Sequence, residues 1–205
     1  MLKIKKIAVT GGLAAGKTTV CKILKELGAY VVSADEIVHQ LLSPGTATSQ
    51  QIITLLGSDS ISGNALDRKK IAAKVFSNPP LLSAMEDLLH PAVFDEINKQ
   101  YQSVRQEGKH ALFVAEIPLL YEAKAEGFFD CVVSVLAAPD LCHQRFMQGA
   151  QHLPEEFDQR MARQMAPEKK AKRAQYILQN DGTLEELKTD VKTLYFQLTN
   201  GEFST

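Results

Sequence analysis

Short apolar runs alternate along the chain with longer stretches in which hydrophobic residues recur every three or four positions. The short runs are typical of parallel strands buried on both faces, and the longer stretches are typical of helices with one apolar face. We therefore expect five strands, over residues 7–9, 29–33, 111–117, 130–136 and 176–178. Strands that alternate with helices predict an α/β fold with a five-stranded parallel sheet and right-handed crossovers.

A long segment between the second and third predicted strands has helical periodicity and no strand pattern. Its apolar spacing predicts five helices, over residues 36–42, 46–57, 67–76, 81–89 and 91–106. The polar residues 58–63 are predicted to form a loop. We place the break between the last two helices at Pro91, because proline is favoured in the first turn of a helix. Residues 36–108 are therefore predicted to form an inserted helical subdomain.

Composition narrows the class of protein without changing the predicted fold. A chain of 205 residues suits one domain with an inserted part, and its net charge of −1 provides no overall field to attract nucleic acid or an anionic membrane. No apolar run approaches the roughly 20 residues that span a bilayer, and the first strand begins too early to leave room for a signal peptide. Cys21, Cys131 and Cys142 lack metal-ligand spacing, which favours a reducing cytoplasm and no zinc site.

The first predicted strand runs into a glycine-rich turn and then into a helix. Gly11, Gly16, Lys17 and Thr18 satisfy the spacing G-x-x-x-x-G-K-[ST] of a phosphate-binding loop. Glycines let the backbone N–H groups point inward, and the helix N-terminus adds partial positive charge. Lys17 can then reach the β- and γ-phosphates, and the Thr18 hydroxyl can join the shell of Mg²⁺. The residues predicted to bind the nucleotide here are Gly12, Ala14, Ala15, Gly16, Lys17, Thr18 and Thr19.

Three further residues with reactive side chains follow predicted strands or stand beside a proline. Asp35 follows the second strand, where it is either a helix cap or a general base that accepts the proton of an attacking hydroxyl. Glu116, near the end of the third strand, either holds Mg²⁺ through water or faces solvent. His90 precedes Pro91, and as an isolated histidine it is either structural or in contact with a substrate.

Arginines are the candidates for neutralising charge on a transferred phosphoryl group. Arg145, Arg160 and Arg163 lie in the second half of the chain, and we expect Arg160 and Arg163 to share one face of a helix. The stretch 149–173 is rich in both charges. We expect the lysines from 169 to 172 in this stretch to form a solvated surface.

Several motifs of the chain together resemble those of one family, the bacterial dephospho-coenzyme A kinases. The resemblance extends over nearly the whole chain in the family's order and spacing. The motifs that carry it are Gly11-Gly12-Leu13-Ala14-Ala15-Gly16-Lys17-Thr18, Ser33-Ala34-Asp35, Pro44-Gly45, His90-Pro91, Pro118-Leu119-Leu120-Tyr121-Glu122, Arg163-Gln164 and Asn180-Asp181-Gly182.

This resemblance implies the last step of coenzyme A synthesis, in which ATP phosphorylates the 3'-hydroxyl of dephospho-CoA with the help of Mg²⁺. It implies three parts: a P-loop NTPase core over 1–35, 109–148 and 174–205, a helical CoA-binding insert over 36–108, and a helical lid over 149–173.

The resemblance also assigns roles to single residues. Asp35 becomes the catalytic base, and His90, Pro118 and Leu119 lie near the acceptor substrate. Asn180 lies near adenine. Apart from the resemblance, the motif and the strand-end position make Thr18 and Glu116 the expected metal-binding residues.

Two positions depart from the family's pattern. Ser33 stands where family members commonly have an acid, and Gly149 stands where an arginine is common at the start of the lid. Arg145 and Arg163 are therefore the expected catalytic arginines, together with Lys17.

Two other functions compete with this one. The first is a kinase for a nucleoside or another small metabolite, since such enzymes share the nucleotide-binding core. The second is a GTPase-type switch, which needs a guanine-reading Asn-Lys-x-Asp and an Asp-x-x-Gly. The chain contains neither motif, because Asn98-Lys99 is followed by Gln100-Tyr101 and no Asp has a Gly three residues later.

Overall fold

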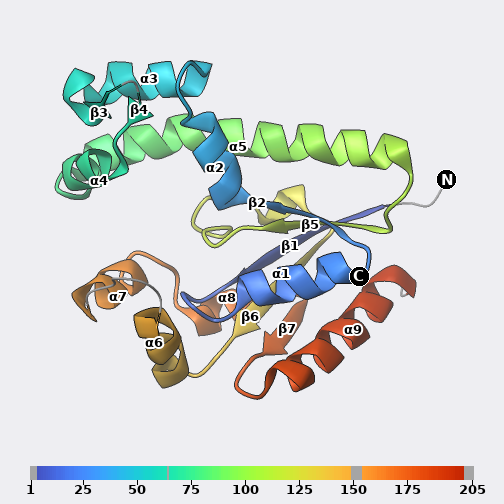
Figure 1. Cartoon of the computed structure of the whole chain (residues 1–205). Helices are drawn as coiled ribbons and strands as arrows, with labels where there is room; N and C mark the ends of the chain where they lie inside the picture. The colour runs from blue at the N-terminus through green and yellow to red at the C-terminus, as the bar shows by residue number, and fades with distance from the viewer. Residues whose placement is uncertain (1–3, 64, 149–153, 201–205) are drawn as a thin grey trace. The chain divides into compact units, whose positions relative to one another are not determined.

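The structure is a computed structural model that describes residues 4–63, 65–148 and 154–200 (Figure 1). The chain divides into two compact units. Unit 1 comprises Met1–Ser33 and Tyr101–Thr205, and unit 2 comprises Ala34–Gln100. Among the described helices, none is long and apolar enough to cross a membrane.

Unit 1 is built on a parallel sheet of five strands in the order β2-β5-β1-β6-β7. The strands are β1 (Lys5–Gly11), β2 (Tyr30–Ser33), β5 (Leu112–Glu116), β6 (Cys131–Leu136) and β7 (Tyr176–Gln179). Each lies within or around a run that the hydrophobic pattern marks as a strand, so the predicted five-stranded parallel sheet is confirmed. The central position of β1 places the glycine-rich turn that follows it in the middle of the sheet's carboxyl edge.

Alternate residues of the central strands bury their side chains on opposite faces of the sheet. On one face, Ile7 and Val9 pack in a core cluster with residues of α1 (Lys17–Glu26) and α9 (Leu184–Asn200). On the other face, Phe113 is fully buried, and the ring of Tyr101 meets it edge-on with ring centroids 5.4 Å apart. Burial on both faces explains why the middle residues of these strands are mostly apolar.

Three helices connect β6 to β7: α6 (Pro139–Gln148), α7 (Pro154–Met161) and α8 (Pro167–Arg173). Arg163 lies in a turn after the end of α7, so the prediction that Arg160 and Arg163 share one helix face is wrong. The start of the predicted lid, including Gly149, lies outside the described residues.

Unit 2 holds α2 (Ala34–Leu41), α3 (Ala47–Leu56), α4 (Arg68–Phe76) and most of α5 (Pro79–Glu107). A short 3-10 helix, η1 (Ser58–Ser60), and an antiparallel pair of strands, β3 (Ile61–Ser62) and β4 (Ala65–Leu66), lie between α3 and α4. Residues 58–63 therefore do not form the plain loop that we expected, and the insert is not purely helical.

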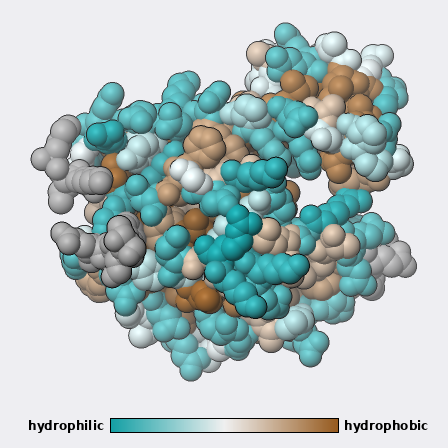
Figure 2. All heavy atoms as spheres, turned by 180° about the vertical axis from the view of Figure 1, so that it is seen from behind, coloured by the Kyte–Doolittle hydropathy of each residue, from teal (hydrophilic) through white to brown (hydrophobic). Residues whose placement is uncertain are grey.

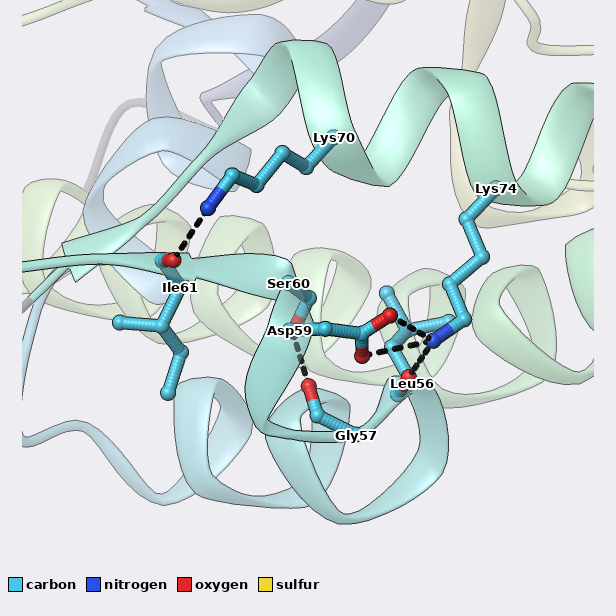
Figure 3. Close-up of polar contacts among 7 residues, drawn as sticks. All are labelled: Leu56, Gly57, Asp59, Ser60, Ile61, Lys70 and Lys74. Atoms are coloured by element: carbon cyan, nitrogen blue, oxygen red, sulfur yellow. Dashed lines mark hydrogen bonds and ion pairs between the residues drawn. The ribbon is translucent and has the colours of Figure 1, made fainter.

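Lysine side chains of α4 hold this irregular segment in place (Figure 3). Lys74 Nζ contacts both carboxylate oxygens of Asp59, at 2.8 and 2.9 Å, and donates to the carbonyl of Leu56 at the end of α3. Lys70 Nζ donates to the carbonyl of Ile61 at 2.8 Å. The hydrogen bond from Lys74 lowers the pKa of Asp59. These contacts satisfy one backbone carbonyl at the end of α3 and one in β3.

α5 runs without a break through Pro91, whereas we expected two helices that meet there. A proline inside a helix removes one hydrogen bond, here the bond to the carbonyl of Asp87. Leu89, Val93 and Ile97 are buried on both sides of Pro91, and this packing maintains one helix across the missing bond.

The core of unit 2 is shallow. Ile52 and Val75 are almost fully buried, but Leu55, Leu81 and Leu82 are only partly covered. Hydrophobic side chains reach the surface at the end of unit 2 that carries α3 and α4, at the upper right of Figure 2. A shallow core depends strongly on each helix cap and ion pair that holds it together.

The last helix of unit 1 provides the first testable prediction. Thr183 and Glu186 form a capping box at the start of α9: Thr183 Oγ1 accepts from the Glu186 N–H at 3.3 Å, and Glu186 Oε2 accepts from the Thr183 N–H at 2.7 Å. Thr183→Ala should destabilise the protein by about 1 kcal/mol. For a chain of this size that loss lowers Tm by roughly 2–4 °C in a thermal melt.

A matched control and a pH series accompany this melt. Thr189→Ala makes the same chemical change in the exposed interior of α9 and should not lower Tm. The hydrogen bonds from Thr183 lower the pKa of Glu186, so the stabilisation is present at neutral pH and is lost as pH falls through the lowered pKa. A Thr183→Ala variant that melts at the wild-type temperature would contradict the assignment.

Candidate nucleotide-binding site

The turn between β1 and α1 has a backbone that only small residues can adopt. Gly11 and Gly16 have φ angles of 144° and 100°, and Ala14 has φ 55°. A Cβ on Gly11 would lie 2.2 Å from the carbonyl oxygen of Val135 on β6, so glycine is required there by space as well as by conformation. This close fit brings the turn against the sheet's carboxyl edge, where open parallel sheets bind their ligands.

The far end of the sheet supports the turn from the other side. Asn180, which follows β7, is buried, and its Nδ2 donates to the carbonyl of Ala15 at 2.8 Å. A Cβ on Gly16 would lie 2.1 Å from this nitrogen. The side-chain amide of Asn180 is thus packed on the glycine turn itself. Its predicted role near adenine stays a prediction.

Lys17 lies at the start of α1 and is 8% exposed. Its Nζ donates to the carbonyl of Gly12 at 2.7 Å, which folds the side chain back along the turn. The backbone N–H groups of the first turn of α1 add partial positive charge at this place. Lysine, backbone amides and helix terminus together form a site suited to a phosphate group.

A hydroxyl and a carboxylate meet next to the lysine. Thr18 Oγ1 donates to Glu116 Oε1 at 2.7 Å, so the end of β5 lies against the start of α1. Magnesium prefers oxygen donors and usually keeps several waters, with one or two carboxylates and substrate phosphates completing its shell. This pair fits that requirement. No cluster of three or more His, Cys, Asp or Glu side chains that could hold a metal occurs in the described part of the chain.

Ser33, one of the two positions that depart from the family's pattern, ends β2 and is the register partner of Glu116. A serine here leaves Glu116 as the only carboxylate of this register pair. The predicted metal site therefore carries less negative charge than it would with an acid at position 33.

A cavity of about 410 Å³ lies beside the glycine turn. Gly12 and Leu13 line it from the turn, Pro139 and Cys142 from α6, and Met161 and Pro167 from α7 and α8. Its volume is in the range of small-molecule sites, and most of its lining is apolar. The turn, α6, α7 and α8 thus line one space.

The three cysteines are free and buried. Burial raises the pKa of the Cys142 thiol at the cavity, and it raises the pKa of Cys131 to about 12. Both remain protonated near neutral pH, so neither is an activated nucleophile.

The structure defines the surroundings of the two predicted catalytic arginines less completely than those of the glycine turn. Arg145, on α6, carries a buried Nη1 that has no hydrogen-bond partner among the described residues. Its charge lowers the pKa of Asp181, the neighbour of Asn180, after larger contributions from Gln179 and the backbone of Ala138. Arg163 is exposed in the turn after α7. The catalytic roles of both arginines stay predictions.

The acceptor-side residues fall in different units. Pro118 and Leu119 follow β5 in unit 1, where the carbonyl of Pro118 accepts a hydrogen bond from Thr10 and the Leu119 side chain is 38% exposed. Asp35 and His90 belong to unit 2. Asp35 is exposed in the first turn of α2, and His90 is half-buried on α5.

Lys170 contradicts the expectation that the lysines from 169 to 172 are solvated. It is 0% exposed, whereas Lys169 and Lys172 are exposed as predicted. A signal in the sequence could have identified it: Pro167, Lys170 and Ala171 follow the spacing of the buried face of a helix. The presence of charge at that position concealed the pattern.

The strand, glycine turn and helix, with Lys17 and the Thr18–Glu116 pair, define a nucleotide-binding protein of the phosphate-loop class. A sequence profile of the dephospho-CoA kinase family matches residues 5–186. The chain therefore belongs to the dephospho-CoA kinase family.

Similar proteins agree with this assignment. A dephospho-CoA kinase of Protochlamydia amoebophila (strain UWE25) is 49% identical over 200 residues, which cover 97% of this chain and 98% of the relative. Among solved structures, TT1252 from Thermus thermophilus matches with a TM-score of 0.82 and 30% identity, over 96% of this chain and 99% of the other. The dephospho-CoA kinase from Campylobacter jejuni matches with a TM-score of 0.71 and 26% identity, over 96% and 98%.

Proposed function

We propose that this protein transfers the γ-phosphoryl group of ATP to the 3'-hydroxyl of dephospho-CoA and so forms coenzyme A and ADP. The observation that carries the proposal is the match to the dephospho-CoA kinase family over residues 5–186. The geometry of Lys17, Thr18 and Glu116 supports it, because phosphoryl transfer requires positioned positive charge and oxygen ligands for a metal.

The donor side of the reaction follows from the glycine turn. The backbone amides of the turn and Lys17 would bind the β- and γ-phosphates, while Thr18 and Glu116 would hold Mg²⁺. Bound there, the ion would supply charge neutralisation for the transferring phosphoryl group. The cavity beside the turn would accept the rest of the nucleotide, and Asn180 bonds the carbonyl of Ala15, which lines this cavity.

The acceptor side rests on Asp35 as general base. As the bond from the γ-phosphorus to the ADP oxygen breaks and a bond to the 3'-oxygen forms, the hydroxyl proton would pass to the Asp35 carboxylate. His90, Pro118 and Leu119 would contact the acceptor. Arg145 and Arg163 would neutralise charge on the phosphoryl group. A lid over 149–173 would exclude water, which otherwise competes with the acceptor.

The cell compartment is part of the same proposal. Coenzyme A carries a free thiol, and the three cysteines of the chain are all unpaired. Disulfides are rare in the cytosol, so free cysteines support a cytoplasmic location.

A coupled assay tests the proposed function. Purified protein, ATP and dephospho-CoA should form ADP and coenzyme A, with activity lost on chelation and restored by Mg²⁺. A panel of nucleosides and other hydroxyl acceptors provides the comparison, because phosphate-loop kinases share the donor site. Preference for a nucleoside over dephospho-CoA would overturn the acceptor, and stronger binding of GTP than ATP without acceptor turnover would indicate a GTPase-type switch.

A further inference from the structure

α8 carries a lysine that is removed from solvent. Lys170 is 0% exposed, and its Nζ donates to the carbonyl of Pro118 at 2.6 Å and lies 2.9 Å from Glu122 Oε1. A buried ammonium group is costly unless hydrogen bonds and an opposite charge replace its water. Both are present, so the site is built around this charge.

The ammonium group joins three segments that are distant in sequence. The carbonyl of Pro118 also accepts from Oγ1 of Thr10, at a longer 3.3 Å; Thr10 is fully buried at the end of β1. Glu122 Oε1 also accepts from the backbone N–H of Met165 at 2.6 Å, just before α8. The end of β1, the segment after β5 and the start of α8 therefore meet at Lys170.

Both ends of α8 have their own contacts with the same surroundings. At its first residue, Pro167 lies so close to the glycine turn that a Cβ on Gly12 would be 3.0 Å from its Cγ. At its last residue, Arg173 pairs with Glu126, and its guanidinium lies 4.4 Å from the centre of the Tyr121 ring. α8 thus spans from the phosphate-binding turn to the segment that follows β5.

We propose that Lys170 is a positioning residue for phosphoryl transfer. By holding the carbonyl of Pro118, it fixes the segment that begins two residues after Glu116 and sets its place relative to the glycine turn. This inference rests on the proposed function, in which Glu116 faces the metal and Pro118 faces the acceptor. Loss of the ammonium group should misalign donor and acceptor, and small displacements of reacting groups slow a reaction strongly.

A purely structural ion pair is the competing explanation, and a charge-neutral double variant separates the two. Lys170→Met alone would leave the Glu122 carboxylate, which is 22% exposed, without its cation and would destabilise the fold. In Lys170→Met/Glu122→Gln both charges are absent, and the Gln oxygen can still accept from Met165. The second oxygen of Glu122 has no hydrogen-bond partner among the described residues, so its replacement by the amide breaks no described bond.

The double variant should melt close to the wild type, yet its kcat should fall about tenfold while KM for ATP stays nearly unchanged. Lys172→Met, an exposed change on the same helix, is the matched control and should leave kcat unchanged. A folded double variant with wild-type kcat would overturn the inference.

Two measurements keep the test decisive. If the double variant does not fold, Thr10→Val provides a second test, because it removes the other donor to the Pro118 carbonyl and leaves the ion pair intact. This variant should also have a lower kcat than the wild type. A wild-type kcat would count against the inference. Hydrogen exchange over residues 117–123 should be faster in the double variant than in Lys172→Met. If the wild type does not turn over dephospho-CoA, the proposed function fails. The exchange comparison then still decides whether Lys170 holds residues 117–123. Unchanged exchange in the double variant would overturn the inference about Lys170.

Discussion

Asp35→Asn should lower kcat by roughly 10²–10⁴-fold, the usual contribution of a positioned general base. Asparagine matches aspartate in shape and is also tolerated in the first turn of α2, so the fold should persist. The carboxylate would act only on the acceptor's proton, and KM for ATP should therefore change by no more than about twofold. Steady-state rates with ATP varied at saturating dephospho-CoA measure both quantities.

Glu36→Gln is the matched control for this substitution. Glu36 is the next residue, is also exposed in the first turn of α2, and loses the same charge. It should keep nearly wild-type turnover. If Asp35→Asn and Glu36→Gln have the same turnover, Asp35 is not the base, and loss of charge near α2 is the better explanation.

Lys17→Met should lower kcat/KM for ATP by about 10²–10³-fold, comparable to the loss of one preorganised donor to a developing charge. Methionine retains most of the buried stem of Lys17, and removes only the group that donates to Gly12 and would meet the phosphates. Unlike the change at Asp35, this one should also weaken nucleotide binding, which isothermal titration with ATP measures directly.

Lys22→Ala is the control for Lys17, because it removes a positive charge from the exposed face of the same helix. It should bind ATP as the wild type does. Equal ATP affinity in Lys17→Met and the wild type would remove Lys17 from the phosphate site and assign its bond with Gly12 a structural role alone.

The sheet and the glycine turn could be predicted because their signals are local. A strand such as Cys131–Leu136 is buried on both faces and therefore shows as an apolar run. The turn requires glycine at Gly11 and Gly16 by conformation, so its spacing is visible in the sequence. The rule that open parallel sheets bind ligands at their carboxyl edge made Glu116 a candidate, and the structure places it beside Thr18 of the motif.

Other features depend on contacts that no local pattern shows. β3 and β4 have two residues each, too few for periodicity to reveal. α5 passes through Pro91 because packing on both sides outweighs one missing hydrogen bond. Lys170 is buried because Glu122 and the carbonyl of Pro118 come from elsewhere in the chain to meet it. Each depends on tertiary contacts that override local preference.

The bond between Asn180 and Ala15 bears on how the protein emerges from the ribosome. The two residues are 165 positions apart, and the strands beside β1 are β5 and β6, which are made long after it. A nascent chain that ends before β7 therefore carries the complete glycine-rich motif but lacks the amide that supports it. Contacts of such long range form late, because a large loop must close first. The nucleotide site is thus among the last parts of the molecule to become complete, although its motif is among the first to be synthesised.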